Sequence, residues 1–167
     1  MVARWQLERI GLGRGAITRR VARAQLLPVH RAVFAVGHTC LTFRGRFMAA
    51  VLACGPDAMA SHHAAAALHD LRPLPQSWID VTAPGRRKHA GVRCHVGAVA
   101  GEDRAKIDSI PVTSLERTLL DYAEQANPRQ LSAALEAAQR QQKLNMITLR
   151  ALIARSPGRR GLAALRR

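Results

Sequence analysis

The order of patterns in residues 4–37 constrains the fold of this chain most strongly. A short helical segment ends at Gly11-Leu12-Gly13, where two glycines around one apolar residue suit a tight turn with positive φ. In the next helical segment Ile17 and Val21 recur four residues apart as a narrow apolar stripe. Strand-forming residues then flank Arg31-Ala32, where we expect the turn of a β-hairpin. This order predicts a winged helix-turn-helix.

Positive charge gathers in the same segment. The chain carries 26 Lys and Arg against 11 Asp and Glu, which is a formal net charge of +15. Residues 1–47 hold nine arginines and one acid, and residues 150–167 hold six arginines and no acid. Residues 48–149 hold eleven bases and ten acids and are almost neutral. Basic segments at the ends of a near-neutral body favour a polyanionic partner.

The second helical segment supplies most of the candidate DNA contacts. Its arginines point away from the apolar stripe, and residues near the start of such a helix meet base edges while later ones meet phosphates. Arg31, at the expected hairpin turn, would contact the DNA backbone or the minor groove. The alternative is a solvated basic helix face. The predicted DNA-binding set is Arg14, Thr18, Arg19, Arg20, Arg23 and Arg31.

A second basic patch lies between two expected strands. Arg86, Arg87 and Lys88 follow Gly85 in a loop that resembles a hairpin tip. These three residues either extend the DNA footprint, meet an acidic partner, or are simply solvated.

The remaining chain predicts a mixed body of short strands and helices. Strand-like pieces occupy residues 78–82, 91–96 and 110–114, and the first two are expected to pair as a hairpin. Helices are expected after Thr42, after Ser61, from a capping box at Thr113-Ser-Leu-Glu116, after Asn127-Pro128, and over roughly residues 147–155.

The predicted fold class is therefore α+β. We expect a winged helix-turn-helix at residues 1–37 with an abbreviated leading helix, and a linking helical pair at 38–71 that can pack with either neighbour. A mixed α/β domain with a small sheet and C-terminal helices should follow at 72–155, and a basic tail at 156–167.

Several features bear on where the chain works. No apolar run approaches the roughly 20 residues of a membrane span, and the first residues lack the apolar region of a signal peptide. Cys40, Cys54 and Cys94 are odd in number and widely spaced, which is typical of free thiols in a reducing compartment. We therefore expect a cytoplasmic protein without a membrane partner.

Taken in order, the strings VHRAVFAVGH, FMAAVLACGPDAMASHHAAAALHDL, WIDVT, GVRCHV and IPVTSLERTLLDYA resemble the actinobacterial AbiEi-type antitoxins of type IV toxin–antitoxin systems. Members commonly begin with another helix before Gln6, carry glycine where this chain has Ala32, and often continue into a Vsr-like endonuclease domain. The resemblance implies a transcriptional regulator that represses its own promoter by binding inverted repeats. Because one short helix reads few base pairs, we expect a homodimer or two copies on the DNA. It also implies functional opposition to a nucleotidyltransferase-type toxin without a stable complex.

Enzymatic readings have weaker support in the sequence. Ser61, His62, His63 and His69 suggest a metal or nucleophile site, but no acid completes a ligand set, and we interpret Ser61 as a helix cap. Asp80 and Lys88 lack the second acid of a nuclease constellation. We expect no catalytic residues, no metal and no cofactor. Arg117 and Asp121, four residues apart, can form an ion pair on one helix face, and the prominence of this RTLLD run in the resembling family implies a buried structural role for the pair.

Two other function classes remain open from the sequence. The chain would be the targeting or accessory portion of a Vsr-like endonuclease protein if a catalytic domain followed it. It would be a protein-interaction module if its N-terminal segment no longer bound DNA.

Overall fold

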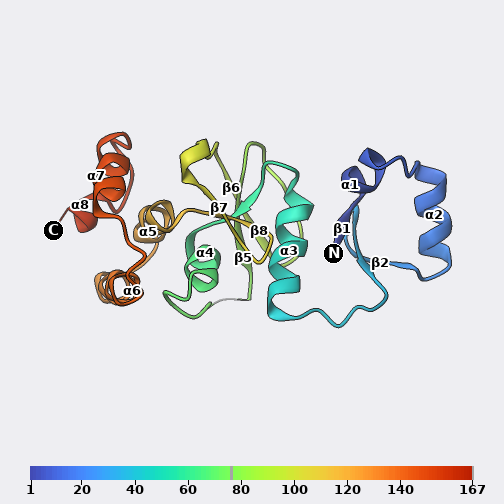
Figure 1. Ribbon diagram of the computed structural model, residues 1–167, viewed down its shortest axis with the longest axis horizontal. Helices are drawn as coiled ribbons and strands as arrows, with labels where there is room; N and C mark the ends of the chain where they lie inside the picture. The colour runs from blue at the N-terminus through green and yellow to red at the C-terminus, as the bar shows by residue number, and fades with distance from the viewer. Residues whose placement is uncertain (76, 167) are drawn as a thin grey trace.

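The computed structural model describes residues 1–75 and 77–166, which form a mixed α+β structure with two sheets (Figure 1). Gln76 and Arg167 lie outside the described residues, so the predicted tail is described up to Arg166. In chain order the elements are β1 (Val2–Ala3), α1 (Arg4–Arg9), α2 (Arg14–Ala22), β2 (Leu26–His30), β3 (Val33–Val36), α3 (Phe43–Cys54), β4 (Met59–Ala60), α4 (His62–Leu68), β5 (Ile79–Ala83), β6 (Val92–Val96), the 3-10 helix η1 (Gly101–Asp103), β7 (Arg104–Ile107), β8 (Ile110–Thr113), α5 (Leu115–Ala123), α6 (Pro128–Arg140), α7 (Met146–Ala154) and α8 (Leu162–Leu165).

The N-terminal elements share a small core of their own. Two helices, α1 and α2, pack on a three-stranded antiparallel sheet of order β1-β3-β2. Its core is formed by Leu7, Ile17, Leu26 and Phe34, so the predicted apolar stripe of α2 does face inward. The turn between the helices has Gly11 at a φ of +87°, the backbone conformation for which glycine was expected.

The β2–β3 hairpin follows the predicted pairing. Pro28 lies in the edge strand β2, where its missing N–H interrupts no further ladder. The register shifts between Pro28 and His30, and Ala32 in the turn has a φ of +63°. A left-handed conformation suits glycine better than alanine, so the turn is strained at Ala32.

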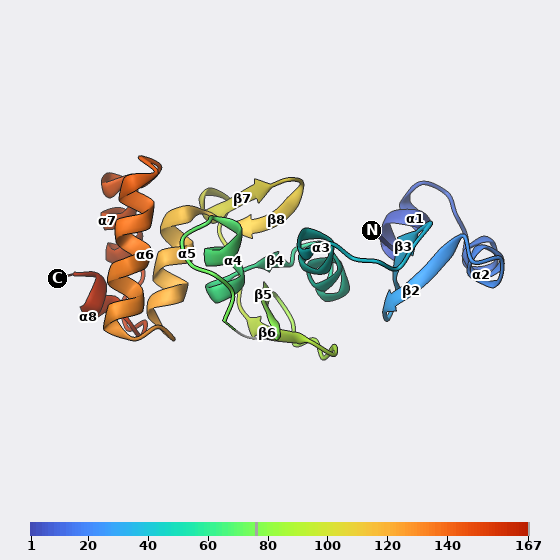
Figure 2. The ribbon, with the colours of Figure 1, turned by 90° about the horizontal axis from the view of Figure 1, so that it is seen from below.

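Helix α3 joins the two halves of the molecule because it is apolar on two sides (Figure 2). Phe47 and Val51 belong to the core of the five-stranded sheet. Ala49 and Leu52 pack with Ala3 and other residues of the N-terminal sheet. The expected cap is present, since the Thr42 Oγ1 accepts a hydrogen bond from the Gly45 N–H at 3.0 Å. The helix therefore packs with both neighbours rather than with one.

The second sheet has the order β6-β5-β4-β8-β7. Strands β5 and β6 pair in parallel, from Ile79 opposite Val92 to Ala83 opposite Val96. The predicted hairpin between them is therefore wrong, and Arg86, Arg87 and Lys88 lie in a loop that carries the chain back along the sheet. The proline and glycine of this loop resemble a hairpin turn, but its eight residues are long enough to return the chain and restart a parallel strand.

One predicted helix start is displaced by a residue. Thr113 ends β8, and its hydroxyl shares a 2.7 Å hydrogen bond with the Thr118 hydroxyl. Ser114 is the N-cap of α5 and accepts from the Arg117 N–H, while Glu116 accepts from the Asn145 N–H instead of closing a capping box. Because Thr113 pairs with Arg104 in the β7–β8 ladder, the hydroxyl of the next residue, Ser114, caps the helix.

Helices cover the face of the sheet opposite α3 (Figures 1 and 2). The alanines of α4 are buried and allow close packing between the sheet and α5. Helix α6 begins at the predicted Asn127-Pro128 cap and packs Leu131 and Ala134 on α5. The end of the chain is docked as well, because Leu162 of α8 packs with Leu120 and Leu152. In the described part of the chain, no helix combines the length and apolar character needed to cross a membrane.

The docking of α8 predicts a contrast between two glycines. Gly158 and Gly161 have φ values of +77° and +80°, so alanine at either position should cost about 1–2 kcal/mol of strain. At Gly161 a Cβ would also lie 2.5 Å from the carbonyl carbon of Ala123, whereas Gly158 has open space. In urea unfolding, Gly161→Ala should lose roughly 1–3 kcal/mol more stability than Gly158→Ala. Equal losses would contradict the packing of α8 on α5.

Candidate nucleic-acid interface

Helix α2 lies at the free end of the molecule, far from the C-terminal helices (Figures 1 and 2). Its inner side packs on the N-terminal core through Ile17, which is 3% exposed, and the partly buried Val21. Its opposite side faces solvent. All six side chains of the predicted DNA-binding set belong to exposed residues, and these are Arg14, Thr18, Arg19, Arg20, Arg23 and Arg31.

These arginines form few ion pairs or hydrogen bonds within the protein. Arg14 approaches Glu8 at 3.9 Å in an ion pair whose two side chains are 88% and 41% exposed, which contributes little to stability. Arg20 donates a long hydrogen bond of 3.4 Å to the Ala16 carbonyl. In residues 1–75 and 77–166, no ion pair joins Arg19, Arg23 or Arg31 to a carboxylate. Their charges are therefore free to meet an external anion.

Three arginines of the body behave differently. Arg117 donates to Asp121 at 2.8 Å and to Asp103 at 3.2 Å, and its side chain is 14% exposed. Arg155 reaches Asp103, and Arg159 reaches Asp121 and Glu124. The expected buried pair of Arg117 and Asp121 is thus present, within a larger network. Arg155 and Arg159 of the basic C-terminal region therefore form ion pairs within the fold.

The structure brings the second basic patch next to the hairpin. The rings of His30 and His89 meet edge to face with centroids 5.8 Å apart. His30 directly precedes Arg31, and His89 directly follows Lys88, so the hairpin turn and the loop carrying Arg86, Arg87 and Lys88 are neighbours. All four basic residues are exposed. Sequence patterns did not indicate this proximity, because it depends on how α3 places the two sheets.

Ser61 and His62 stand in a buried polar cluster. The Thr82 hydroxyl donates to the Ser61 Oγ at 2.8 Å, and the Ser61 Oγ shares a 2.9 Å hydrogen bond with the His62 Nδ1. The His62 ring stacks on His95 with centroids 3.8 Å apart. Burial lowers the pKa of His62 to about 3, and His95 acts in the same direction, so the ring is neutral at pH 7. Ser61 occupies the predicted N-cap position of α4, but its hydroxyl does not cap the helix.

This cluster gives no support to the hydrolase or metal interpretations. Ser61 is 0% exposed, so its hydroxyl is closed to a substrate. His69 lies elsewhere and bonds the Thr113 carbonyl. Asp80 is buried and bonded to His95, whereas Lys88 is exposed, so the two do not form a nuclease pair. Across the described residues, no group of three or more His, Cys, Asp or Glu is arranged to hold a metal ion.

Comparison with known proteins adds no name to this site. No protein-family model matches the chain, and no curated protein is significantly similar to it. The resemblance to AbiEi-type antitoxins therefore depends on the motifs of the sequence and stays a prediction.

The buried ion pairs of the body predict that removing a buried carboxylate destabilises the fold much more than removing an exposed one. Asp121 is fully buried and accepts from both Arg117 and Arg159, so Asp121→Ala should cost about 3 kcal/mol or more. Glu136 forms an exposed ion pair with Arg140 at 3.8 Å, so Glu136→Ala should cost less than about 0.5 kcal/mol. Chemical unfolding of both variants measures the difference, and similar losses would show that the buried network does not hold the fold.

Proposed function

We propose that this chain is a sequence-specific DNA-binding transcriptional regulator whose N-terminal unit is a winged helix-turn-helix. The order of β1, α1, α2 and the β2–β3 hairpin is the order of such a unit after its leading helix. In this interpretation α2 is the recognition helix that enters the major groove, and the hairpin is the wing.

The contrast in arginine pairing is the observation that carries this proposal. Arg117, Arg155 and Arg159 of the body are bound to carboxylates, whereas the arginines of α2 and the hairpin turn extend into solvent without a strong internal partner. A fold that needed these charges for its own stability would place acids beside them. Their position suits base edges and phosphates instead, since arginine presents several donors to both.

The neighbouring loop extends the proposed footprint. Arg86, Arg87 and Lys88 lie beside the hairpin turn, where they can meet phosphates flanking the groove that α2 enters. One recognition helix reads few base pairs, so two copies of the chain on an inverted repeat would supply the required specificity.

The AbiEi resemblance supports the biological part of the proposal. As an antitoxin of a type IV system, the chain would repress its own promoter in the cytoplasm and oppose a nucleotidyltransferase-type toxin without a stable complex. The body would carry this second role.

A gel shift with the DNA upstream of the gene tests the regulator proposal. The chain should retard this fragment more strongly than random DNA. Replacing both Arg19 and Arg23 by alanine should weaken binding at least about tenfold, because each well-placed arginine contributes roughly 1–3 kcal/mol.

The matched control removes the same charge from another place. Arg129 and Arg140 are exposed on α6, so their double replacement by alanine should leave DNA affinity almost unchanged. If both double variants bind equally weakly, net charge rather than α2 carries the binding. If the upstream fragment is retarded no more than random DNA, the chain is not a sequence-specific regulator.

A further inference from the structure

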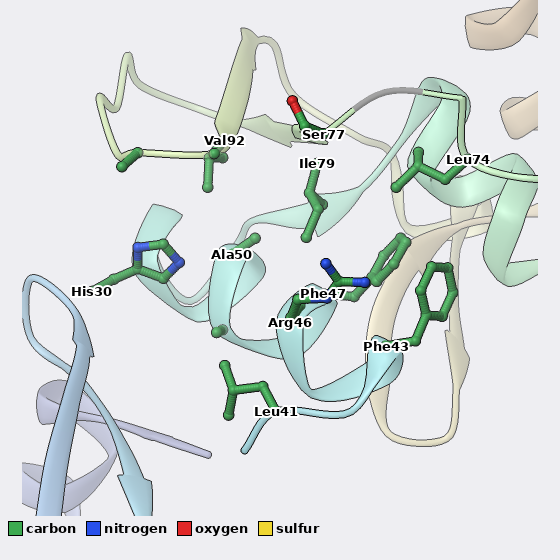
Figure 3. A pocket seen from close by; sticks show the side chains of 13 residues that line it. His30, Leu41, Phe43, Arg46, Phe47, Ala50, Leu74, Ser77, Ile79 and Val92 are labelled. Carbon is green, nitrogen blue, oxygen red and sulfur yellow. The ribbon is translucent and has the colours of Figure 1, made fainter. Parts of the chain in front are cut away.

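A cavity of about 330 Å³ lies where the N-terminal hairpin, α3 and the five-stranded sheet meet (Figure 3). His30 reaches it from the hairpin, Leu41 from the segment before α3, Phe43 from the first residue of α3, and Ile79 and Val92 from strands β5 and β6. Its size is at the lower end of the range for small-molecule sites, which also favour junctions between structural units.

Most of the cavity wall is apolar, with one charged group among the described lining residues. That group is the guanidinium of Arg46, an exposed residue in the first turns of α3. In the part of the chain that the structure describes, no ion pair joins Arg46 to a carboxylate. Its neighbour Arg44, outside the cavity wall, is paired with Asp108. An unpaired cation beside an apolar wall favours a ligand that has an apolar body and a single negative charge.

The wall also offers aromatic contacts. The Phe43 and Phe47 rings lie 4.6 Å apart between centroids, tilted by 55°. The Arg46 guanidinium carbon lies 5.9 Å from the Phe43 ring centroid. Phe43 is 44% exposed, so part of its ring is available for contact. A planar aromatic body can pack against these rings while its charged end reaches Arg46.

We propose that this cavity binds a small aromatic monocarboxylate, with the ring among the apolar side chains and the carboxylate on the Arg46 guanidinium. His30 faces the same space. Its pKa is lowered first by burial and second by the charge of the nearby His89, so it supplies a neutral polar group at neutral pH. Such a ligand would touch the hairpin, α3 and the sheet at once, and would fix their relative position.

Binding of 2-naphthoate, followed by its own fluorescence in the absence of DNA, tests the site separately from the regulator proposal. The intact chain should bind it saturably with a Kd below about 1 mM. The uncharged analogue 2-naphthalenemethanol should bind about tenfold more weakly.

Two variants on the same helix give the matched comparison. Arg46→Gln should weaken naphthoate binding about tenfold and leave the alcohol unaffected, while Arg44→Gln should change neither. Ala90 is an exposed lining residue, so Ala90→Trp should block the cavity to both probes without disturbing the fold.

Thermal unfolding checks that each variant remains folded. The proposal is overturned if naphthoate binding is not saturable, if the alcohol binds as well as the acid, or if Arg46→Gln and Arg44→Gln behave alike. Unchanged naphthoate binding by Ala90→Trp would place the probe elsewhere and would also overturn it.

Discussion

The burial of α3 on two sides is the constraint on which the rest of the structure depends. Phe47, 1% exposed, is held in the core of the five-stranded sheet, and Leu52, 7% exposed, packs in the N-terminal core. Burying a large apolar side chain contributes roughly 1.5–3 kcal/mol, so separating either sheet from α3 would expose several such groups at once. Because one rigid helix holds both sheets, the hairpin turn and the β5–β6 loop come side by side. The joined basic surface and the cavity beside Arg46 both follow from this arrangement.

Charge is divided between two uses. In the body, carboxylates form ion pairs with arginines such as Arg117 and Arg159. These pairs connect α5 to the end of the chain. At the N-terminal end, exposed arginines have little internal use, and the energy they can contribute is available to a partner. Net charge alone does not distinguish these cases, since the C-terminal region is as rich in arginine as α2. The structure separates Arg155 and Arg159, which bind carboxylates, from Arg19 of α2 and Arg23 at its end, which bind none in the described part of the chain.

Local chemistry explains which parts of the fold could be predicted from the sequence. The caps at Thr42 and Asn127, the glycine turn at Gly11 and the edge strand at Pro28 each depend on a few adjacent residues, and all were predicted correctly. The two-residue strands β1 and β4 are too short to show an alternating pattern, so they were missed. The parallel pairing of β5 and β6 and the contact of His30 with His89 depend on distant residues and had no local signal. The same holds for the two apolar sides of α3, because apolar residues along a helix do not show which elements will pack on them.

The central claim is that α2 and the adjacent hairpin form the DNA-contacting surface. Backbone amide chemical shifts of the isotopically labelled chain, titrated with its upstream duplex, test this residue by residue. We expect the largest changes between Arg14 and Arg23 and around Arg31, with smaller ones over residues 86–88. Changes confined to the C-terminal helices, or equal changes with an unrelated duplex, would contradict the claim.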